Sequence, residues 1–170
     1  VRHCKHNYNL TNTIEIIKNE NENHGRNHYA AWWYCVVPIT DNLKNNLPVP
    51  LFVNGDDIEY SMRQSGGIIC LNGVSIWHEP FHIKYNPVKQ YYLAVRNGLI
   101  INTRHDFSPI RSLALVFLRF IYLLVKGNKE GAQLVLNGFS DFLKGSHAIL
   151  TRKQEQIFHQ HNPDLFKEKC

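Results

Sequence analysis

The sequence predicts an α/β fold up to about residue 85, followed by an all-helical region. Short apolar runs separated by Gly, Pro and Asn in the first half are typical of strands and turns. The second half instead shows helix-start signals ahead of longer apolar segments. With 170 residues, of which 44% are hydrophobic, the chain is long enough to bury one core and is expected to form a single domain or a piece of a larger one.

The first half contains strand-like runs around one short helix. Residues 1–28 are polar except for an apolar run at Ile14, Ile16 and Ile17, which we interpret as a single strand or a helical turn. Residues 29–37 then predict a strand or an extended segment ending in a turn, and strand-like runs follow at residues 51–53 and 68–76. Between the last two, residues 58–64 predict a helix with an acidic first turn, which Gly66-Gly67 ends.

The second half predicts four helices. Asn86-Pro87 starts a helical pattern that continues through Leu99. Ser108-Pro109 is an N-cap and first-turn signal for an apolar helix ending near Gly127. A third helix is expected over residues 129–144 with Gly145 as its stop, and Thr151 with Gln154 resembles a capping box for a fourth.

Charge, cysteine usage and hydropathy restrict the class of protein. The formal net charge is +5, with Lys and Arg spread along the chain, which weakly favours an anionic partner such as a nucleotide or an acidic membrane surface. The four cysteines form no CxxC pair and no zinc spacing, which fits a reduced compartment. The apolar stretch 113–125 contains Arg119 and is shorter than the roughly 20 residues of a membrane span. We therefore expect a buried or membrane-surface helix in a cytoplasmic protein. A peripheral association with the inner face of the cell membrane is compatible with this helix.

An acidic pair, Asp56-Asp57, follows the apolar run that ends at Asn54-Gly55. Adjacent carboxylates repel each other, so they are retained where a cation, a bound hydroxyl or a helix N-terminus compensates their charge. Taken alone, the pair is also ordinary turn and cap chemistry. The pair and Trp77-His78 both lie at the ends of strand-like runs, where open α/β sheets place their sites.

Other side chains with functional chemistry are ambiguous when each is considered alone. The imidazole of His78 can bind a metal through one nitrogen, or it can be a hydrogen-bonded, partly buried side chain. The aromatic triplet Trp32-Trp33-Tyr34 can stack on sugar rings or pack into a core. Arg63 and Arg96 can contact phosphate, although arginines on helix surfaces are mostly solvated.

Five segments occur in order along the chain: Trp32-Trp33, the proline-flanked run 47–53, the Asp-Asp-Ile-Glu-Tyr-Ser-Met-Arg motif 56–63, the Gly-Val-Ser-Ile-Trp-His motif 73–78, and the Tyr-rich helix 91–97 ending in Arg-Asn. Together they resemble the acceptor-site half of family-2 glycosyltransferases, and most closely the galactofuranosyltransferase-like branch. The resemblance covers about residues 29–105, and more loosely the helical tail to about 150. The ordered set is more specific than any one motif and outweighs the structural interpretation of each.

The resemblance implies a fold and a reaction. The fold is of GT-A type (Rossmann-like), of which this chain would form the acceptor-side half with short strands, followed by a C-terminal helical region. The reaction is transfer of a sugar, such as galactofuranose or a related sugar, from a nucleotide-sugar donor to a glycan acceptor, with inversion, in cell-surface polysaccharide synthesis. Asp57 matches the base that deprotonates the acceptor hydroxyl, and Asp56 matches its acceptor-binding neighbour. His78 matches a ligand of the divalent metal, Mn or Mg, that holds the donor diphosphate.

The remaining candidate residues concern the acceptor and the phosphates. Trp32 and Trp33 match aromatic acceptor-site residues, and Trp77, next to His78, is grouped with them as acceptor-binding. Arg63 and Arg96 are candidates for phosphate or acceptor contacts.

The chain departs from the family pattern in two places. The nucleotide-binding strands and their Asp-x-Asp metal motif should precede Trp32, and neither is found there; close relatives carry a histidine where this chain has Ala94. The chain also opens without Met and without a signal peptide. We therefore expect a fragment of a longer enzyme, with residues 1–105 as the acceptor-side half and 106–170 as the helical region. We expect it to transfer no sugar alone, with its metal site completed outside the chain.

Three alternatives compete with this interpretation. The first is a non-catalytic carbohydrate-binding or assembly module that kept the acceptor groove. The second is a metal-dependent hydrolase using Asp56, Asp57, Glu59 and His78, which no known ligand spacing supports. The third is nucleic-acid binding, which we do not expect because the sequence contains no recognisable motif or basic stripe.

Overall fold

The computed structural model describes residues 8–9, 11–21, 31–37, 46–51, 54–64, 68, 85–145 and 156–157. The chain divides into two compact units, which are described separately: Val1–Pro48 with Asp57–Glu79, and Val49–Asp56 with Pro80–Cys170. Regular structure in the described residues is helical, apart from a single bridge residue at Ile68. Most of the strand-like runs at 51–53 and 68–76 lie outside the described residues. The α/β class therefore stays a prediction.

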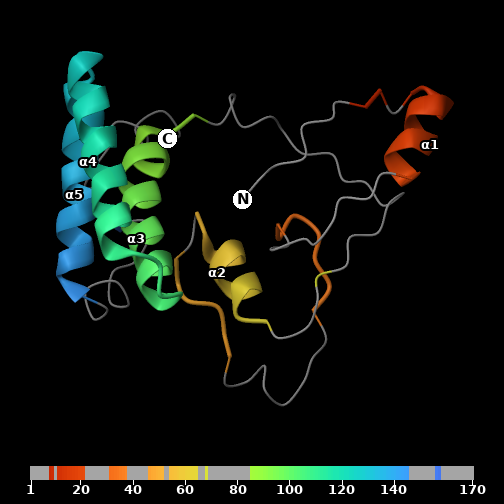
Figure 1. The fold of residues 1–170 in the computed structure, drawn as a ribbon, viewed down its shortest axis with the longest axis horizontal. Coiled ribbons are helices and arrows are strands. Elements are labelled where there is room, and N and C mark those ends of the chain that lie inside the picture. The colour runs from red at the N-terminus through yellow and green to blue at the C-terminus, as the bar shows by residue number, and fades with distance from the viewer. Residues whose placement is uncertain are drawn as a thin grey trace. The chain divides into compact units, whose positions relative to one another are not determined.

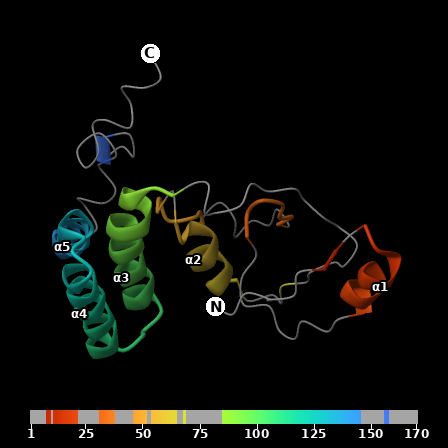
Figure 2. The ribbon, with the colours of Figure 1, turned by 90° about the horizontal axis from the view of Figure 1, so that it is seen from above.

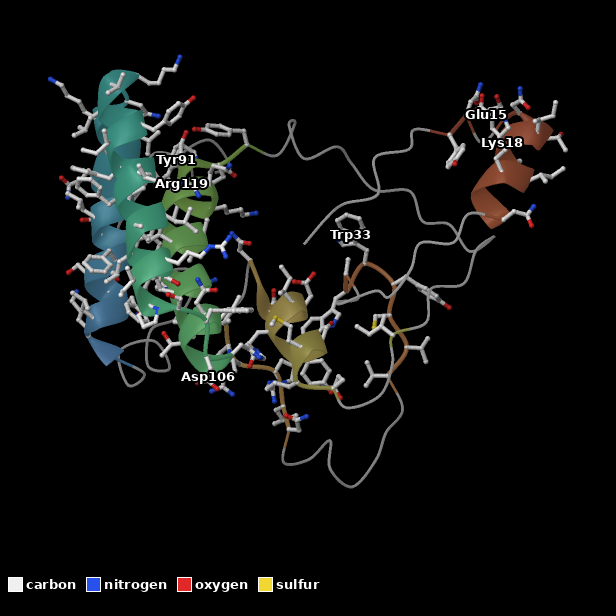
Figure 3. All side chains as sticks on the ribbon, in the orientation of Figure 1. Glu15, Lys18, Trp33, Tyr91, Asp106 and Arg119 are labelled. Carbon is white, nitrogen blue, oxygen red and sulfur yellow. The ribbon has the colours of Figure 1, made fainter. Side chains whose placement is uncertain are left out.

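The first unit contains α1, Thr13–Asn21. The side-chain oxygen of Asn12 accepts a hydrogen bond from the backbone N–H of Ile14 at 2.9 Å, which satisfies a donor that the first turn leaves open. Glu15 lies in the first turn and Lys18 in the last turn (Figure 3), and both charges suit the helix dipole. Of the two interpretations of this segment, the helical one is therefore confirmed.

Residues 31–37, expected to be strand-like, contain a turn. The turn covers Trp32, Trp33 and Tyr34, and residues 35–37 continue as irregular chain. Aromatic and β-branched residues favour strands only when a neighbouring strand receives their backbone hydrogen bonds and their side chains pack across it. In the described part of the chain, this segment has no such pairing.

The second unit contains a run of helices that the sequence predicts well (Figure 1). They are η2 (Val88–Leu93), α3 (Ala94–Arg104), α4 (Pro109–Val125) and α5 (Lys129–Leu143). Figures 1 and 2 both show α3, α4 and α5 side by side. The segment η2 is a π-helix that leads directly into α3. A π turn is rare and interrupts the 3.6-residue repeat, so a sequence periodicity does not reveal it.

The signals that bound these helices act as expected. The Ser108 hydroxyl accepts from the backbone N–H of Arg111 at 3.4 Å, and Pro109 occupies the first helical position. Gly127 has a φ of 72°, a left-handed conformation that glycine adopts without a steric penalty, and Gly145 has a φ of 80°. The predicted ends of α4 and α5 are therefore confirmed. Of the fourth predicted helix, only residues 156–157 are described, and they are helical.

Two apolar clusters join these helices. Val95 and Leu99 of α3 pack with Leu123 of α4 and with Ala132 and Val135 of α5. A second cluster joins η2 to α5 and to Ile157. Helices η2, α3, α4 and α5 all belong to the second unit. The predicted division into residues 1–105 and 106–170 stays a prediction.

Tyr92 makes the principal buried polar contact of this core. It is fully buried, and its hydroxyl donates a hydrogen bond to the Asp141 carboxylate at 2.5 Å. The other oxygen of Asp141 lies 2.5 Å from the Lys144 ammonium. Burial, together with the hydrogen bond to Asp141, raises the pKa of Tyr92 to about 12. The phenol therefore stays neutral in the folded chain at a pH where an exposed tyrosine ionises.

Tyr92→Phe should lower the free energy of unfolding by about 1–3 kcal/mol at neutral pH, because Asp141 loses a buried donor. In the wild type, folded Tyr92 keeps its proton above pH 10 while the unfolded chain loses it. The contribution of Tyr92 is thus complete below pH 10 and declines as the pH rises toward about 12. Urea unfolding at pH 8 to 11.5 should show a smaller loss of stability above pH 10 for the variant. Equal slopes in both proteins would contradict this, and Tyr122→Phe, at an exposed tyrosine of α4, is the control.

Candidate active site

The acidic pair Asp56-Asp57 forms the first turn of α2, Asp56–Met62. Both side chains are partly buried, and one Asp57 oxygen accepts from the backbone N–H of Ile58 at 2.8 Å. The helix starts and ends two residues earlier than the expected range 58–64, because both aspartates take helical conformations rather than preceding the helix. Carboxylates at this end of a helix are favoured by its dipole.

The turn before α2 needs an unusual backbone. Asn54 has a φ of 132° and Gly55 a φ of 94°. Gly55 is also buried, and a Cβ atom there would lie 2.6 Å from Cδ1 of Ile101. A left-handed φ together with this close approach explains why the Asn-Gly pair precedes the acidic pair.

In the first unit, α2 contacts one of the predicted aromatic residues. The rings of Trp32 and Tyr60 meet edge-to-face, with centroids 5.5 Å apart and planes inclined at 69°. Trp32 is 38% exposed, Trp33 (labelled in Figure 3) is 51% exposed, and Tyr60 is buried. The structure thus brings Trp32 to the helix that begins with the acidic pair, through a tyrosine that the sequence motif contains but to which we assigned no role.

Arg63, one of the two candidate phosphate contacts, is already engaged within the first unit. Its Nε atom lies 2.8 Å from the buried carboxylate of Glu59, and its guanidinium stacks over Tyr60 at 5.4 Å from the ring centroid. It also donates to the side chain of Asn46 and to the backbone oxygen of Leu47. These contacts make Arg63 a structural cation that connects α2 to residues 46–47.

Arg96, the other candidate phosphate contact, has one buried guanidinium nitrogen that could donate to a ligand. It lies in α3 of the second unit and is only 2% exposed. Its Nε donates to Oδ1 of Asn97 at 2.9 Å, and its guanidinium lies over the Tyr92 ring at 5.5 Å from the centroid. Its buried Nη2 atom has no hydrogen-bond partner among the residues that the structure describes. A buried guanidinium nitrogen without an acceptor is costly, so Arg96 fits an anionic or carbonyl ligand.

Two candidate residues, Trp77 and His78, lie outside the described residues. The convergence of Asp56, Asp57 and His78 on one site therefore stays a prediction. In the described ranges, no group of three or more His, Cys, Asp or Glu side chains could hold a metal ion. These residues alone do not form the expected Mn or Mg site, and that expectation depends on His78 and on ligands from elsewhere.

The outer surface of α4 is strongly apolar. Ile110 is 81% exposed and Val125 is 80% exposed, and between them Leu113, Leu115, Phe117, Leu118 and Leu124 are also exposed. The inner side of the helix packs against α3 and α5 through Leu123. Arg119 folds back to donate to the backbone oxygen of Gln90 at 2.7 Å and lies over the Tyr91 ring, as Figure 3 shows. None of the helices among the described residues combines the length and apolar character that crossing a membrane requires.

Comparison with known proteins identifies relatives for part of the chain. Galactofuranosyltransferase GlfT2 of Mycolicibacterium smegmatis is 30% identical over 95 residues, which are 54% of this chain and 15% of the relative. The chain is related to glycosyltransferases. Galactofuranosyltransferase GlfT2 of Mycobacterium tuberculosis is 31% identical over 85 residues, which are 48% of this chain and 13% of the relative. The chain matches only this small share of either enzyme, and neither a family model nor a solved structure matches it.

Proposed function

We propose that the chain is the acceptor-side part of an inverting family-2 glycosyltransferase of GT-A type, with an α/β fold in its first half. It would move a sugar such as galactofuranose from a nucleotide-sugar donor to a glycan acceptor in cell-surface polysaccharide synthesis. The partial similarity to two galactofuranosyltransferases carries the proposal. The acidic pair at the start of α2 and the contact between Trp32 and Tyr60 support it.

The proposed chemistry assigns one step to each carboxylate. Asp57 accepts the proton of the acceptor hydroxyl while that oxygen attacks the anomeric carbon, and the nucleoside diphosphate leaves from the opposite side of the sugar. Asp56 accepts a hydrogen bond from a neighbouring acceptor hydroxyl and orients it. A divalent metal, Mn or Mg, would neutralise the diphosphate when bound, with His78 as one ligand.

The other residues bind rather than react. The exposed indoles of Trp32 and Trp33 offer apolar surfaces to the C–H faces of a sugar, and Trp77 is proposed to join them. Arg96 would supply its spare Nη2 donor to a phosphate or acceptor oxygen. Arg63, which also contacts Glu59 and the backbone oxygen of Leu47, stays a proposed phosphate or acceptor contact.

The 170-residue chain alone should transfer no sugar, whereas a full-length protein that adds a nucleotide-binding half should do so. The reason is that a divalent-metal site usually draws on several ligands, and His78 is the single ligand that we assign from this sequence. The assay follows release of nucleoside diphosphate with nucleotide-sugar donors, Mn or Mg, and a glycan acceptor. Turnover by the chain alone would show that the donor site lies within these residues. Glycan binding without turnover by the full-length protein would instead favour the carbohydrate-binding module.

We also propose peripheral association with an anionic membrane surface through the outer face of α4. A helix with apolar residues all round needs a second apolar environment when only one side is packed against protein. Basic residues occur near both ends of the helix: Arg111 in its first turn, Lys126 as its C-cap, and Lys129 as the first residue of α5. The formal net charge of +5 also favours binding to an anionic lipid surface.

Phe117→Glu should weaken binding of the chain to vesicles containing anionic lipid by about tenfold or more. Burial of an exposed phenylalanine contributes about 1.5–3 kcal/mol, and the new carboxylate is repelled by the lipid headgroups. Vesicle sedimentation measures the partition. Gln133→Glu, at an exposed position of α5, adds the same charge without removing apolar surface and should have a much smaller effect. Equal partitioning of wild type and Phe117→Glu would exclude α4 as the contact.

A further inference from the structure

Asn97 of α3 makes three hydrogen bonds although it lies in the interior. Its side chain is 1% exposed. The amide nitrogen donates to the backbone oxygens of Leu51 and Asn54, both at 2.7 Å. Its oxygen accepts from Nε of Arg96 at 2.9 Å. Both amide hydrogens are therefore used, and both hold the same short segment of chain.

The segment that Asn97 holds is the one leading into α2. Leu51 is fully buried and packs with Ile100 and Ile101 of α3. Gly55 lies so close to Ile101 that a Cβ atom would be 2.6 Å from its side chain. Asp56 follows directly. Residues 51 and 54–56 and the helix α3 all belong to the second unit, so the start of α2 is attached to the helical core.

The attachment is needed because this turn is unfavourable by itself. Asn54 has a positive φ of 132°, a conformation that non-glycine residues rarely take unless surrounding contacts impose it. The Leu51 and Asn54 carbonyls each need a donor, and the Asn97 amide serves both. Removing the two donors would free the turn to adopt other conformations and would move the residue that follows it.

We propose that Asn97 is a positioning residue for the Asp56-Asp57 pair. It holds the backbone oxygens of Leu51 and Asn54 on α3, and Asn54-Gly55 leads directly into the acidic pair, so these bonds support the placement of the carboxylates at the start of α2. The inference rests on the proposed function, since it assigns the pair a catalytic role. It adds that a side chain of α3 supports the backbone from which α2 starts.

The attachment of the turn by Asn97 can be tested in the 170-residue chain by a measurement that needs no enzymatic activity. Asn97→Asp keeps the size of the side chain and the acceptor for Arg96, but it removes both donors and sets a carboxylate against two carbonyl oxygens. Amide hydrogen exchange over residues 51–58 should become about tenfold faster or more, while exchange in α5 stays unchanged. Unchanged exchange over residues 51–58, or equal acceleration throughout the chain, would overturn the anchoring role.

Asn102→Asp is the matched control. Asn102 lies on the same helix, and its amide donates to the hydroxyl oxygen of Ser112 at 2.9 Å, which connects α3 to α4. Asn102 is less buried than Asn97, but the substitution removes the same chemical group from the same helix, away from the turn. It should leave exchange over residues 51–58 unchanged.

The catalytic consequence is tested in the full-length protein. Asn97→Asp should lower kcat about 10-fold to 100-fold with a smaller change in KM, because a small displacement of a catalytic group is costly. On an Asp57→Asn background, the same substitution should lower kcat by less than about threefold, since there is no base left to misplace. Losses that multiply fully would show that Asn97 does not act through the pair.

The two experiments separate failure of this inference from failure of the proposed function. If Asp57→Asn alone left turnover unchanged, the assignment of the base would fail, and with it the catalytic role of the anchor. The exchange measurement would still decide whether Asn97 holds the turn. If Asp57→Asn abolished turnover and Asn97→Asp had no effect on kcat, only the positioning role would be overturned.

Discussion

Asp57→Asn in the full-length protein should lower kcat by about 10²- to 10⁴-fold, the usual contribution of a general base. The amide has nearly the same size as the carboxylate and can still accept the hydrogen bond from the Ile58 N–H, so α2 should keep its start. It cannot take the proton of the acceptor hydroxyl. The measurement is the initial rate of nucleoside diphosphate release at saturating donor and acceptor.

Donor affinity distinguishes this loss from a general defect. Asp57→Asn should leave donor binding nearly intact, whereas His78→Ala should weaken the part of donor binding that depends on the metal. Asp106→Asn is the matched control, because Asp106 is exposed and has a φ of 54°, a conformation that asparagine also accepts (Figure 3). Undiminished turnover of Asp57→Asn would show that another group is the base.

Helix ends in the second half are predictable because their signals are local. The Ser108 cap, Pro109 and Gly127 act within one or two turns of the backbone that they shape. The π character of η2 is not predictable in this way, since it arises from the packing of the helix and leaves no pattern in residue type. Local signals therefore predict where these helices begin and end. They do not predict the π turn in η2, which changes the rotation of the following helix α3 and of its residue Arg96.

The candidate site is only partly accessible to sequence analysis. Asp56 and Asp57 stand out because two adjacent carboxylates are conspicuous, but Asn97 does not, because its partner Leu51 is 46 residues away in the chain. Asn97 lies in a helix that also contains Arg96, Asn102 and Arg104, so its residue type does not distinguish a buried position from an exposed one. Likewise, the contact of Trp32 with Tyr60 depends on a turn at residues 32–34, where the residue types favour a strand.

Gly138→Ala should destabilise the second unit by about 1–3 kcal/mol, the usual range for added volume in a packed interior. Gly138 lies in α5, and a Cβ atom there would be 2.5 Å from the backbone oxygen of Tyr92 in η2. A backbone atom cannot move aside as a flexible side-chain end can. The two helices would have to separate, which would disturb the neighbouring hydrogen bond from Tyr92 to Asp141. This cost exceeds the gain of up to about 1 kcal/mol that alanine brings to a helix.

Gly98→Ala provides a control of opposite sign for that experiment. Gly98 lies within α3, and a Cβ atom there meets nothing within 4 Å among the described residues. Alanine should therefore stabilise the chain there by up to about 1 kcal/mol, through helix propensity alone. Urea unfolding followed by circular dichroism compares the two variants with the wild type. A Gly138→Ala chain as stable as Gly98→Ala would show that α5 and η2 do not approach this closely, and the packing that holds Tyr92 and Arg96 would need revision.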